Sequence, residues 1–281
     1  MQAMLPQHTL SRLAGLLVEC KQPMIKKLLM KLFLNCYDVN LSEAESTDLN
    51  TYDSFQSLFT RKLRPEARPI AIGDTVLVSP VDGTISEMGD IKGQQVLQVK
   101  GCYYDLADLL ALKPHQDNPF NSGHFMTIYL APKDYHRVHM PCEGVLQQAV
   151  YVPGRLFSVN ERSVGRIPRL FARNERLICY FDSPAGPFAV IFVAAMLVAG
   201  IHTSFAGRIV PNSAKEKQIS DYGNLPFAKG AELGYFCYGS TVILLFPKQR
   251  AQFLPSLAAG QSLRMGQAIG AIGSGAYSIA N

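Results

Sequence analysis

The sequence predicts an α+β fold in which a helical, amphipathic N-terminal portion precedes a largely antiparallel β core. Leucines recur at helical spacing near the start of the chain, and short β-rich runs separated by Gly, Pro and Asp follow from Asp74 onward. A hydrophobic fraction of 48% and a charged fraction of 17% over 281 residues argue against disorder and provide an ample core. The acidic stretch near residue 45 is the one predicted boundary, between residues 1–45 and residues 46–281.

The first predicted helix covers residues 9–19, where four leucines share one face, and a second begins at Pro23. The apolar stripe of the second helix is formed by Met24, Ile25, Leu28, Leu29, Leu32 and Phe33. Lys26, Lys27 and Lys31 occupy the rest of its surface. A basic amphipathic helix suits a membrane interface, with its lysines toward anionic headgroups, but a surface helix packed on the core has the same pattern. From this stretch alone, both interpretations stay open.

A polar, acidic stretch at residues 41–58 leads into a short predicted helix near Ser54 to Thr60. The basic loop that follows is punctuated by proline, and its charged residues are Arg61, Lys62, Arg64 and Arg68. Most of these charges suit a solvated loop. The guanidinium group of an arginine can also bind a phosphate or a substrate carboxylate through two hydrogen bonds.

The β core is predicted from short runs of β-branched and aromatic residues bounded by turn signals. These runs are Thr75–Val78, Thr84–Met88, Gln95–Val99, Phe125–Leu130, Gly144–Val152, Leu177–Phe181 and Phe188–Ala194. The longest apolar run, Phe188 to Ile201, is too short for a spanning helix and suggests a buried strand pair. The Gly-rich segment Gly266 to Gly275 lacks a Gly-Lys-Ser/Thr ending, so turns between small strands are expected there.

Composition limits the classes of protein that remain. The six cysteines show no Cys-x-x-Cys spacing, which favours free thiols in a reducing compartment over a disulfide framework or a zinc site. The net charge of +5 is compatible with anionic lipid surfaces or nucleic acid and selects neither. No compact apolar segment with a small-residue cleavage site opens the chain. Together with the absence of a long apolar helix, these features predict a soluble or peripheral protein.

Gly239, Ser240 and Thr241 interrupt a chain that otherwise resembles two strands. Tyr235 to Tyr238 favour a strand before them, and Val242 to Phe246 favour a short apolar strand after them. A Gly-Ser turn in a hairpin is the simplest interpretation. The other is a bond that the protein cuts itself, because glycine tolerates a strained backbone and the neighbouring hydroxyl can attack its carbonyl. This second interpretation requires a base elsewhere in the chain.

Two histidines, His136 and His139, are candidates for that base. Most histidines are hydrogen-bonded structural residues. A metal site is a second interpretation, which we discount because Glu143 is the one close third ligand. As a general base, an imidazole titrates near neutral pH and can take a hydroxyl proton. Asp82, a candidate partner, lies in a Pro-Val-Asp-Gly sequence that also predicts an ordinary turn.

Four segments together resemble the bacterial phosphatidylserine decarboxylases, in that family's order. Residues 129–144, YLAPKDYHRVHMPCEG, are similar to its histidine motif, which is long and highly specific. Residues 59–65 (FTRKLRP), 79–83 (SPVDG) and 229–241 (KGAELGYFCYGST) are similar to its other motifs. The resemblance covers nearly the whole chain. Tyr238 departs from it, since the family usually has leucine at that position.

By this resemblance, Asp82, His139 and Ser240 correspond to the family's self-cleavage triad. The chemistry is coherent, because a carboxylate can orient an imidazole and stabilise its charged form while the imidazole deprotonates a serine. The Ser240 hydroxyl would attack the Gly239 carbonyl and convert the peptide to an ester. Elimination and hydrolysis would then leave a pyruvoyl group and ammonia.

The family's activity implies that the protein converts phosphatidylserine to phosphatidylethanolamine and CO2 in phospholipid biosynthesis. A β chain of residues 1–239 and an α chain of residues 240–281, headed by the pyruvoyl group, would form the enzyme. The pyruvoyl carbonyl would form a Schiff base with the substrate amine, so neither a metal nor a dissociable cofactor is implied. His136, the first histidine of the motif, is the implied substrate contact or proton donor.

Residues 154–160, GRLFSVN, resemble a substrate-pocket segment of the family. Phe157, Ser158 and Asn160 are therefore implied substrate contacts, although a β-bulge or a loop with an Asn-Glu turn has the same pattern. The implied partners are phosphatidylserine, the membrane surface, the two chains of one precursor and a second copy in a homodimer, with no nucleic acid. A peripheral location on the cytoplasmic face of the cell membrane is implied as well.

Three alternatives remain open. A Ser-His-Asp hydrolase would use Ser240 as an intact nucleophile, although the Gly-x-Ser-x-Gly elbow of the common hydrolase fold is absent around it. A non-catalytic membrane-binding module would tolerate changes at Ser240 and His139. The third alternative keeps the pyruvoyl chemistry but acts on a different amino-acid head group. The amphipathic N-terminus argues for a lipid substrate without excluding this third alternative.

Overall fold

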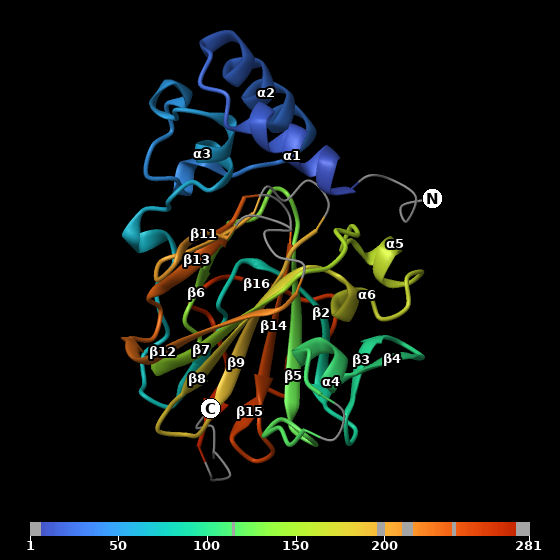
Figure 1. Cartoon of the computed structure of the whole chain (residues 1–281). Coiled ribbons are helices and arrows are strands. Elements are labelled where there is room, and N and C mark those ends of the chain that lie inside the picture. The colour runs from blue at the N-terminus through green and yellow to red at the C-terminus, as the bar shows by residue number, and fades with distance from the viewer. Residues whose placement is uncertain (1–6, 114–115, 196–199, 210–215, 238–239, 274–281) are drawn as a thin grey trace.

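The computed structural model describes residues 7–113, 116–195, 200–209, 216–237 and 240–273 (Figure 1). The α-helices in these ranges are α1 (Gln7–Val18), α2 (Pro23–Cys36), α3 (Phe55–Phe59), α4 (Leu106–Leu110), α5 (Glu161–Val164) and α6 (Leu170–Arg173). Short 3-10 helices lie at Leu41–Glu43, Leu49–Thr51 and Pro65–Ala67.

The strands in the described ranges outnumber the helices and confirm the predicted α+β class. They are β1 (Val76–Val78), β2 (Gly83–Asp90), β3 (Gln95–Val99), β4 (Cys102–Asp105), β5 (His124–Leu130), β6 (Arg137–His139), β7 (Gly144–Val152), β8 (Arg176–Asp182), β9 (Phe188–Val193), β10 (Ile201–Thr203), β11 (Gly207–Ile209), β12 (Gln218–Phe227), β13 (Glu232–Phe236), β14 (Ser240–Phe246), β15 (Ala251–Phe253), β16 (Ser262–Leu263) and β17 (Ala268–Ile272). Each of the seven predicted runs overlaps one of these strands.

The two amphipathic helices lie together at one end of the molecule, above the sheets (Figure 1). Pro23 is the first residue of α2, and the side chain of Gln22 accepts a hydrogen bond from the Ile25 N–H at 2.9 Å, which caps the helix. Met30 and Phe33 are the buried residues of α2. None of the described helices is long and apolar enough to cross a membrane.

A second, smaller hydrophobic core lies beneath these helices. It is formed by Met30, Phe33, Tyr52, Phe55, Leu58 and Phe59. Helix α3 contributes three of these residues, and a reciprocal capping box between Ser54 and Ser57 fixes where it begins. The cluster includes residues from both sides of position 45, and the division there into two parts stays a prediction.

The main core surrounds an eight-stranded antiparallel sheet with the order β12-β7-β8-β9-β14-β5-β2-β16. Strand β14 lies between β9 and β5, and all seven of its residues are buried. Its continuous apolar sequence suits a strand that is covered on both faces. The run Phe188 to Ile201, expected to be a buried strand pair, contains β9 and the first residue of β10, while residues 196–199 lie outside the described part.

Two smaller sheets complete the frame of the site. One has the order β11-β10-β13-β6, and the other has the order β1-β17-β15. The Gly-rich segment Gly266 to Gly275 was expected to form turns between small strands, and its residues Ala268–Ile272 form the small strand β17, which pairs with a strand on each side. The physical reason is visible at Gly270, where any Cβ would collide with the backbone carbonyl of Gln252. Glycine here permits the close approach of two strands rather than a turn.

Candidate active site

Ser240 is the first residue of β14, at the centre of the main sheet. It pairs with Leu130 of β5, and its side chain is fully buried. The Ser240 hydroxyl has no hydrogen-bond partner among the described residues. Because a buried hydroxyl without a partner costs free energy, its presence calls for a functional explanation. Tyr238 and Gly239, the other residues of the predicted cleavage site, lie outside the described part of the chain.

His136 is positioned by backbone and ring contacts. Its carbonyl accepts a hydrogen bond from the N–H of Phe236, the last residue of β13, at 3.1 Å. Its ring stacks on Phe59 with 4.1 Å between centroids, and its Nε2 donates to the Ala131 carbonyl at 3.1 Å. Burial and, secondly, the charge of Arg61 lower the pKa of His136 to about 3. The ring is therefore neutral at physiological pH, and its Nδ1 lone pair has no partner among the described residues.

His139 is the last residue of β6, and both of its ring nitrogens are hydrogen-bonded. Its Nδ1–H donates to the Gly230 carbonyl at 2.9 Å, which leaves Nε2 to accept from the Tyr135 hydroxyl at 3.1 Å. Burial lowers the pKa of His139, so the ring is neutral near pH 7 with its basic lone pair on Nε2. The sequence analysis missed Tyr135, although a tyrosine four residues before His139 in the same motif was an available signal.

Asp82 lies in the turn between β1 and β2, next to the strand that ends at His139. The His139 N–H donates to the Pro80 carbonyl at 2.8 Å, which joins the two segments. The Asp82 carboxylate accepts from Arg68 Nε at 2.9 Å and from the Met265 backbone N–H at 2.8 Å. The turn is thus held between β6 on one side and the segment before β17 on the other.

Arg68 belongs to the basic run in which most charges were expected to be solvated, but it is buried in an ion-pair cluster with Asp82 and Glu43. Burial lowers the pKa of Arg68, but the two carboxylates outweigh burial and the net shift is upward. The described hydrogen bonds of Asp82 and His139 therefore go to other partners, and a direct contact between these two residues stays a prediction. The charge of Asp82 still acts on His139, where it raises the pKa against the effect of burial.

Comparison with known proteins identifies the family. A family model described as phosphatidylserine decarboxylase matches residues 55–271, and a second model, described as PSD, matches residues 1–38. The chain belongs to the phosphatidylserine decarboxylase family. The phosphatidylserine decarboxylase proenzyme of Alcanivorax borkumensis is 46% identical over 275 residues, covering 96% of this chain and 94% of the relative. The proteins of the same name from Pseudomonas fluorescens and Marinobacter nauticus are each 45% identical, covering 96% of this chain and 95% of the relative.

In this member of the phosphatidylserine decarboxylase family, the predicted substrate-pocket segment, residues 154–160, is linked through hydrogen bonds of Asn174 to the end of β9, the strand beside β14. The Phe157 carbonyl and the Ala194 carbonyl both accept hydrogen bonds from Asn174 Nδ2, at 2.8 and 2.9 Å. Ala194 directly follows β9, which pairs with β14. Phe157 is buried, Ser158 is half-buried, and Asn160 caps α5 with its side-chain oxygen. Substrate contacts by these three residues stay a prediction.

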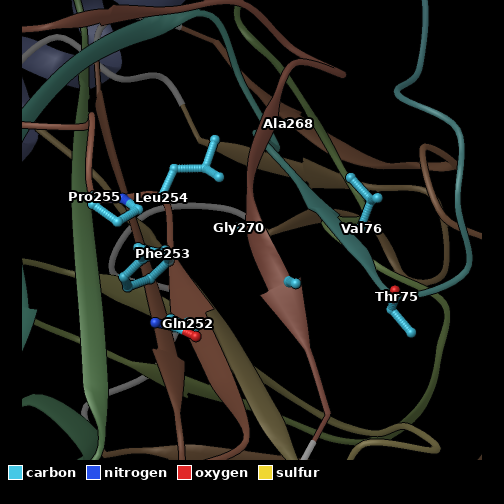
Figure 2. A pocket seen from close by; sticks show the side chains of 9 residues that line it. Thr75, Val76, Gln252, Phe253, Leu254, Pro255, Ala268 and Gly270 are labelled. Atoms are coloured by element: carbon cyan, nitrogen blue, oxygen red, sulfur yellow. The ribbon is translucent and has the colours of Figure 1, made fainter. Parts of the chain in front are cut away.

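The apolar cavity in Figure 2 is separate from the candidate site of this family member. It has a volume of about 360 Å³, lies between β1, β15 and β17, and is lined by no titratable side chain. The ring of Phe253 in its wall contacts Phe246, the last residue of β14, whereas Ser240 is the first. The cavity therefore lies toward the opposite end of that strand.

Proposed function

We propose that the chain is a proenzyme that cuts itself before Ser240 and then converts phosphatidylserine to phosphatidylethanolamine and CO2. The observation that carries this proposal is the fully buried Ser240 hydroxyl, unpartnered among the described residues, in a chain whose relatives are named phosphatidylserine decarboxylase proenzymes. A serine hydroxyl that makes no structural hydrogen bond is available to react as a nucleophile.

Self-cleavage would begin when Ser240 Oγ attacks the carbonyl carbon of Gly239 and gives its proton to a base. His139 is the proposed base, since its ring is neutral and the lone pair lies on Nε2. The peptide becomes an ester, and removal of the Ser240 Cα proton expels the Gly239 carboxylate. Water then hydrolyses the resulting enamine to a pyruvoyl carbonyl and ammonia. Asp82 would stabilise the protonated His139 through its charge.

The pyruvoyl group at position 240 would supply a carbonyl that withdraws electrons from the amine-bearing carbon of the substrate. The surroundings fit such a group, because the Ser240 side chain is fully buried and its hydroxyl makes no described hydrogen bond that conversion to a pyruvoyl group would break. His136 presents an acceptor lone pair on Nδ1, so we propose that it binds the substrate amine. Of its two predicted roles, substrate contact is favoured over proton donation, since its low pKa keeps the ring neutral.

Helices α1 and α2 are the proposed contact with the lipid surface. Their exposed large apolar side chains are Leu13, Leu16, Leu17, Met24, Ile25, Leu28 and Leu32. Such side chains gain free energy when they enter the apolar part of a bilayer interface. The inner face of α2 leads toward the site, because Phe33 contacts Phe59 at 5.9 Å between centroids and Phe59 stacks on His136. The proposed location is the cytoplasmic face of the cell membrane, and the homodimer stays a prediction.

An intact mass spectrum of the purified protein under denaturing conditions tests this proposal. We expect two species, of which the smaller begins at position 240 and lacks one ammonia relative to a chain with an N-terminal serine. A single uncut mass from protein that is active would overturn the proposal and favour a hydrolase with an intact Ser240.

Three variants separate maturation from decarboxylation. Ser240→Ala removes the nucleophile and His139→Ala removes the base, so both should remain one uncut chain without decarboxylase activity. His136→Ala should be cut normally and decarboxylate poorly, because it removes a substrate contact alone. Full activity of Ser240→Ala would contradict the pyruvoyl chemistry, and unchanged turnover of His136→Ala would remove the role assigned to that ring.

A further inference from the structure

Arg61 differs from the other buried arginines in the described part of the chain, which are Arg68 and Arg176. Arg68 bonds two carboxylates, and Arg176 donates through all three guanidinium nitrogens to four backbone carbonyls. Arg61 is only 4% exposed, yet its Nε and Nη1 have no partner among the described residues. Its one described side-chain hydrogen bond is from Nη2 to the Lys133 carbonyl at 3.1 Å.

A buried guanidinium with two unpaired nitrogens destabilises a folded protein, because its charge has lost water and gained too few hydrogen bonds in return. Burial correspondingly lowers the pKa of Arg61. An anion that binds in the working enzyme would satisfy the two vacant nitrogens and account for the arrangement. Guanidinium N–H groups make strong, charge-assisted hydrogen bonds to phosphate and carboxylate oxygens.

The segment that carries Arg61 is hydrogen-bonded both to the residue after His136 and to a residue just before Ser240. Arg137, at the start of β6, donates through Nε to the Thr60 carbonyl at 3.0 Å. Gln56 of α3 donates through Nε2 to the Cys237 sulfur at 3.2 Å, three positions before Ser240. Phe59, two residues before Arg61, stacks on the His136 ring at 4.1 Å between centroids, and the charge of Arg61 helps to lower the pKa of that ring. An anion on Arg61 would therefore lie beside His136.

The proposed substrate carries two anionic groups, a carboxylate and a phosphodiester. The carboxylate leaves as CO2, and an arginine bound to it would stabilise the reactant more than the transition state, in which its charge disperses. The phosphodiester keeps its charge throughout the reaction. It is separated from the amine-bearing carbon by one methylene group and one oxygen, so an arginine near His136 can hold it while the amine reaches position 240.

We propose that Arg61 binds the phosphodiester of the substrate headgroup and positions the amine for reaction with the group formed at position 240. The inference rests on the proposed function, because it assigns a substrate group to the same site. It identifies Arg61 as a specificity-determining residue. Free serine and other amino acids without the phosphodiester should therefore be poor substrates.

The test compares purified wild-type protein with Arg61→Met, Arg61→Lys and the control Arg64→Met. Arg64 lies in the same loop, but its side chain is 52% exposed and pairs with the exposed Glu66. The substrate is a short-chain phosphatidylserine below its critical micelle concentration, which removes membrane binding from the measurement. The inhibitor is the matching phosphatidylethanolamine, which has the phosphodiester and no carboxylate. Intact mass spectra report self-cleavage of every variant.

We expect Arg61→Met to be cut, and to show a KM for phosphatidylserine and an inhibition constant for phosphatidylethanolamine that both rise about 10-fold to 100-fold. Arg61→Lys should fall between wild type and Arg61→Met, and Arg64→Met should match wild type. Arg61→Met should also raise Tm, because it removes a buried charge with two unpaired nitrogens, whereas loss of a merely structural arginine would lower Tm.

Each other outcome overturns a distinct statement. If both constants are unchanged in Arg61→Met, Arg61 does not bind the substrate. If KM rises while inhibition by phosphatidylethanolamine is unchanged, Arg61 binds the carboxylate and the phosphodiester assignment is wrong. If neither Arg61→Met nor Arg61→Lys is cut, Arg61 acts in maturation instead. Wild-type protein that is uncut or inactive on phosphatidylserine would contradict the proposed function itself, before any variant is compared.

Discussion

Asp82 Oδ1 accepts a hydrogen bond from the backbone N–H of Met265 at 2.8 Å, across 183 positions of the chain. The proposed cleavage before Ser240 would place these two residues on different chains. Strand β14, which begins at Ser240, also pairs with β5 and with β9. The residues after the cut are thus built into the central sheet rather than attached to its surface.

The first prediction follows from this arrangement: after self-cleavage the two chains remain associated. Size-exclusion chromatography under native conditions should give one peak that contains both chains, and they should separate only in denaturant. The backbone ladder on both sides of β14 and its seven buried residues are the physical reason. Two peaks from native, active protein would contradict this prediction.

The second prediction concerns the buried pair of Asp82 and Arg68. Asp82→Asn should lower the free energy of unfolding by about 3 kcal/mol, because it leaves the buried Arg68 with one carboxylate fewer. It should also slow self-cleavage, because it removes a negative charge that stabilises protonated His139. Urea unfolding of the uncut Ser240→Ala background measures the first effect. The exposed pair Arg64–Glu66 is the control, and Glu66→Gln should change stability by less than about 1 kcal/mol. Equal losses from both substitutions would show that Asp82 has no special structural role.

The third prediction tests the tautomer of His139. The Tyr135 hydroxyl donates to Nε2 and so stabilises the neutral ring. Tyr135→Phe should raise the pKa of His139 and shift the lower pH limit of self-cleavage upward, by up to about one pH unit. Cell-free synthesis followed by transfer to a series of buffers gives the cleavage rate as a function of pH. Tyr103→Phe, at a half-exposed tyrosine of β4, is the control, and a shift of the same size there would invalidate the assignment.

The fourth prediction concerns stability and pH. The pKa of His136 is about 3 in the folded chain, against an unfolded value near 6.5. Above about pH 6.5 the His136 ring is neutral in both the folded and the unfolded chain. Below that pH the ring takes up a proton in the unfolded chain alone. Falling pH therefore favours unfolding, by about 1.4 kcal/mol per pH unit for this ring. In the uncut Ser240→Ala background, His136→Gln should flatten the loss of stability between about pH 7 and pH 5. Parallel pH profiles would show that His136 is not buried as a neutral ring.

The fifth prediction concerns the lipid surface. Replacing Leu16 and Leu28, which are 71% and 58% exposed, by serine should weaken binding to vesicles of anionic phospholipid at least about 10-fold, since each side chain loses its transfer into the bilayer. Self-cleavage should be unaffected. Ile219→Ser is the matched control, because that isoleucine is 52% exposed and belongs to the edge strand β12, not to either helix. Sedimentation with vesicles measures the binding, and an equal loss in the control would remove the specific role of α1 and α2.

Local sequence patterns were sufficient for much of the fold. The leucine spacing predicted α1, Pro23 predicted where α2 begins, and the apolar run after Ser240 predicted β14. The largest omission was β12, a strand of ten residues at the edge of the main sheet, most of them exposed. An edge strand that is mostly exposed has no continuous apolar face, so its sequence carries a weak periodic signal.

What the sequence determined by itself was the α+β class, the family and the chemical types at the site, because motifs and periodicity are local properties of the chain. Only the tertiary structure decided their partners. It placed Gly230 and Tyr135 on the ring of His139, Arg68 and Met265 on Asp82, and left Arg61 buried with two guanidinium nitrogens unpaired among the described residues. Burial and hydrogen-bond partners arise from contacts between segments far apart in the chain, and no local pattern records which segments will meet.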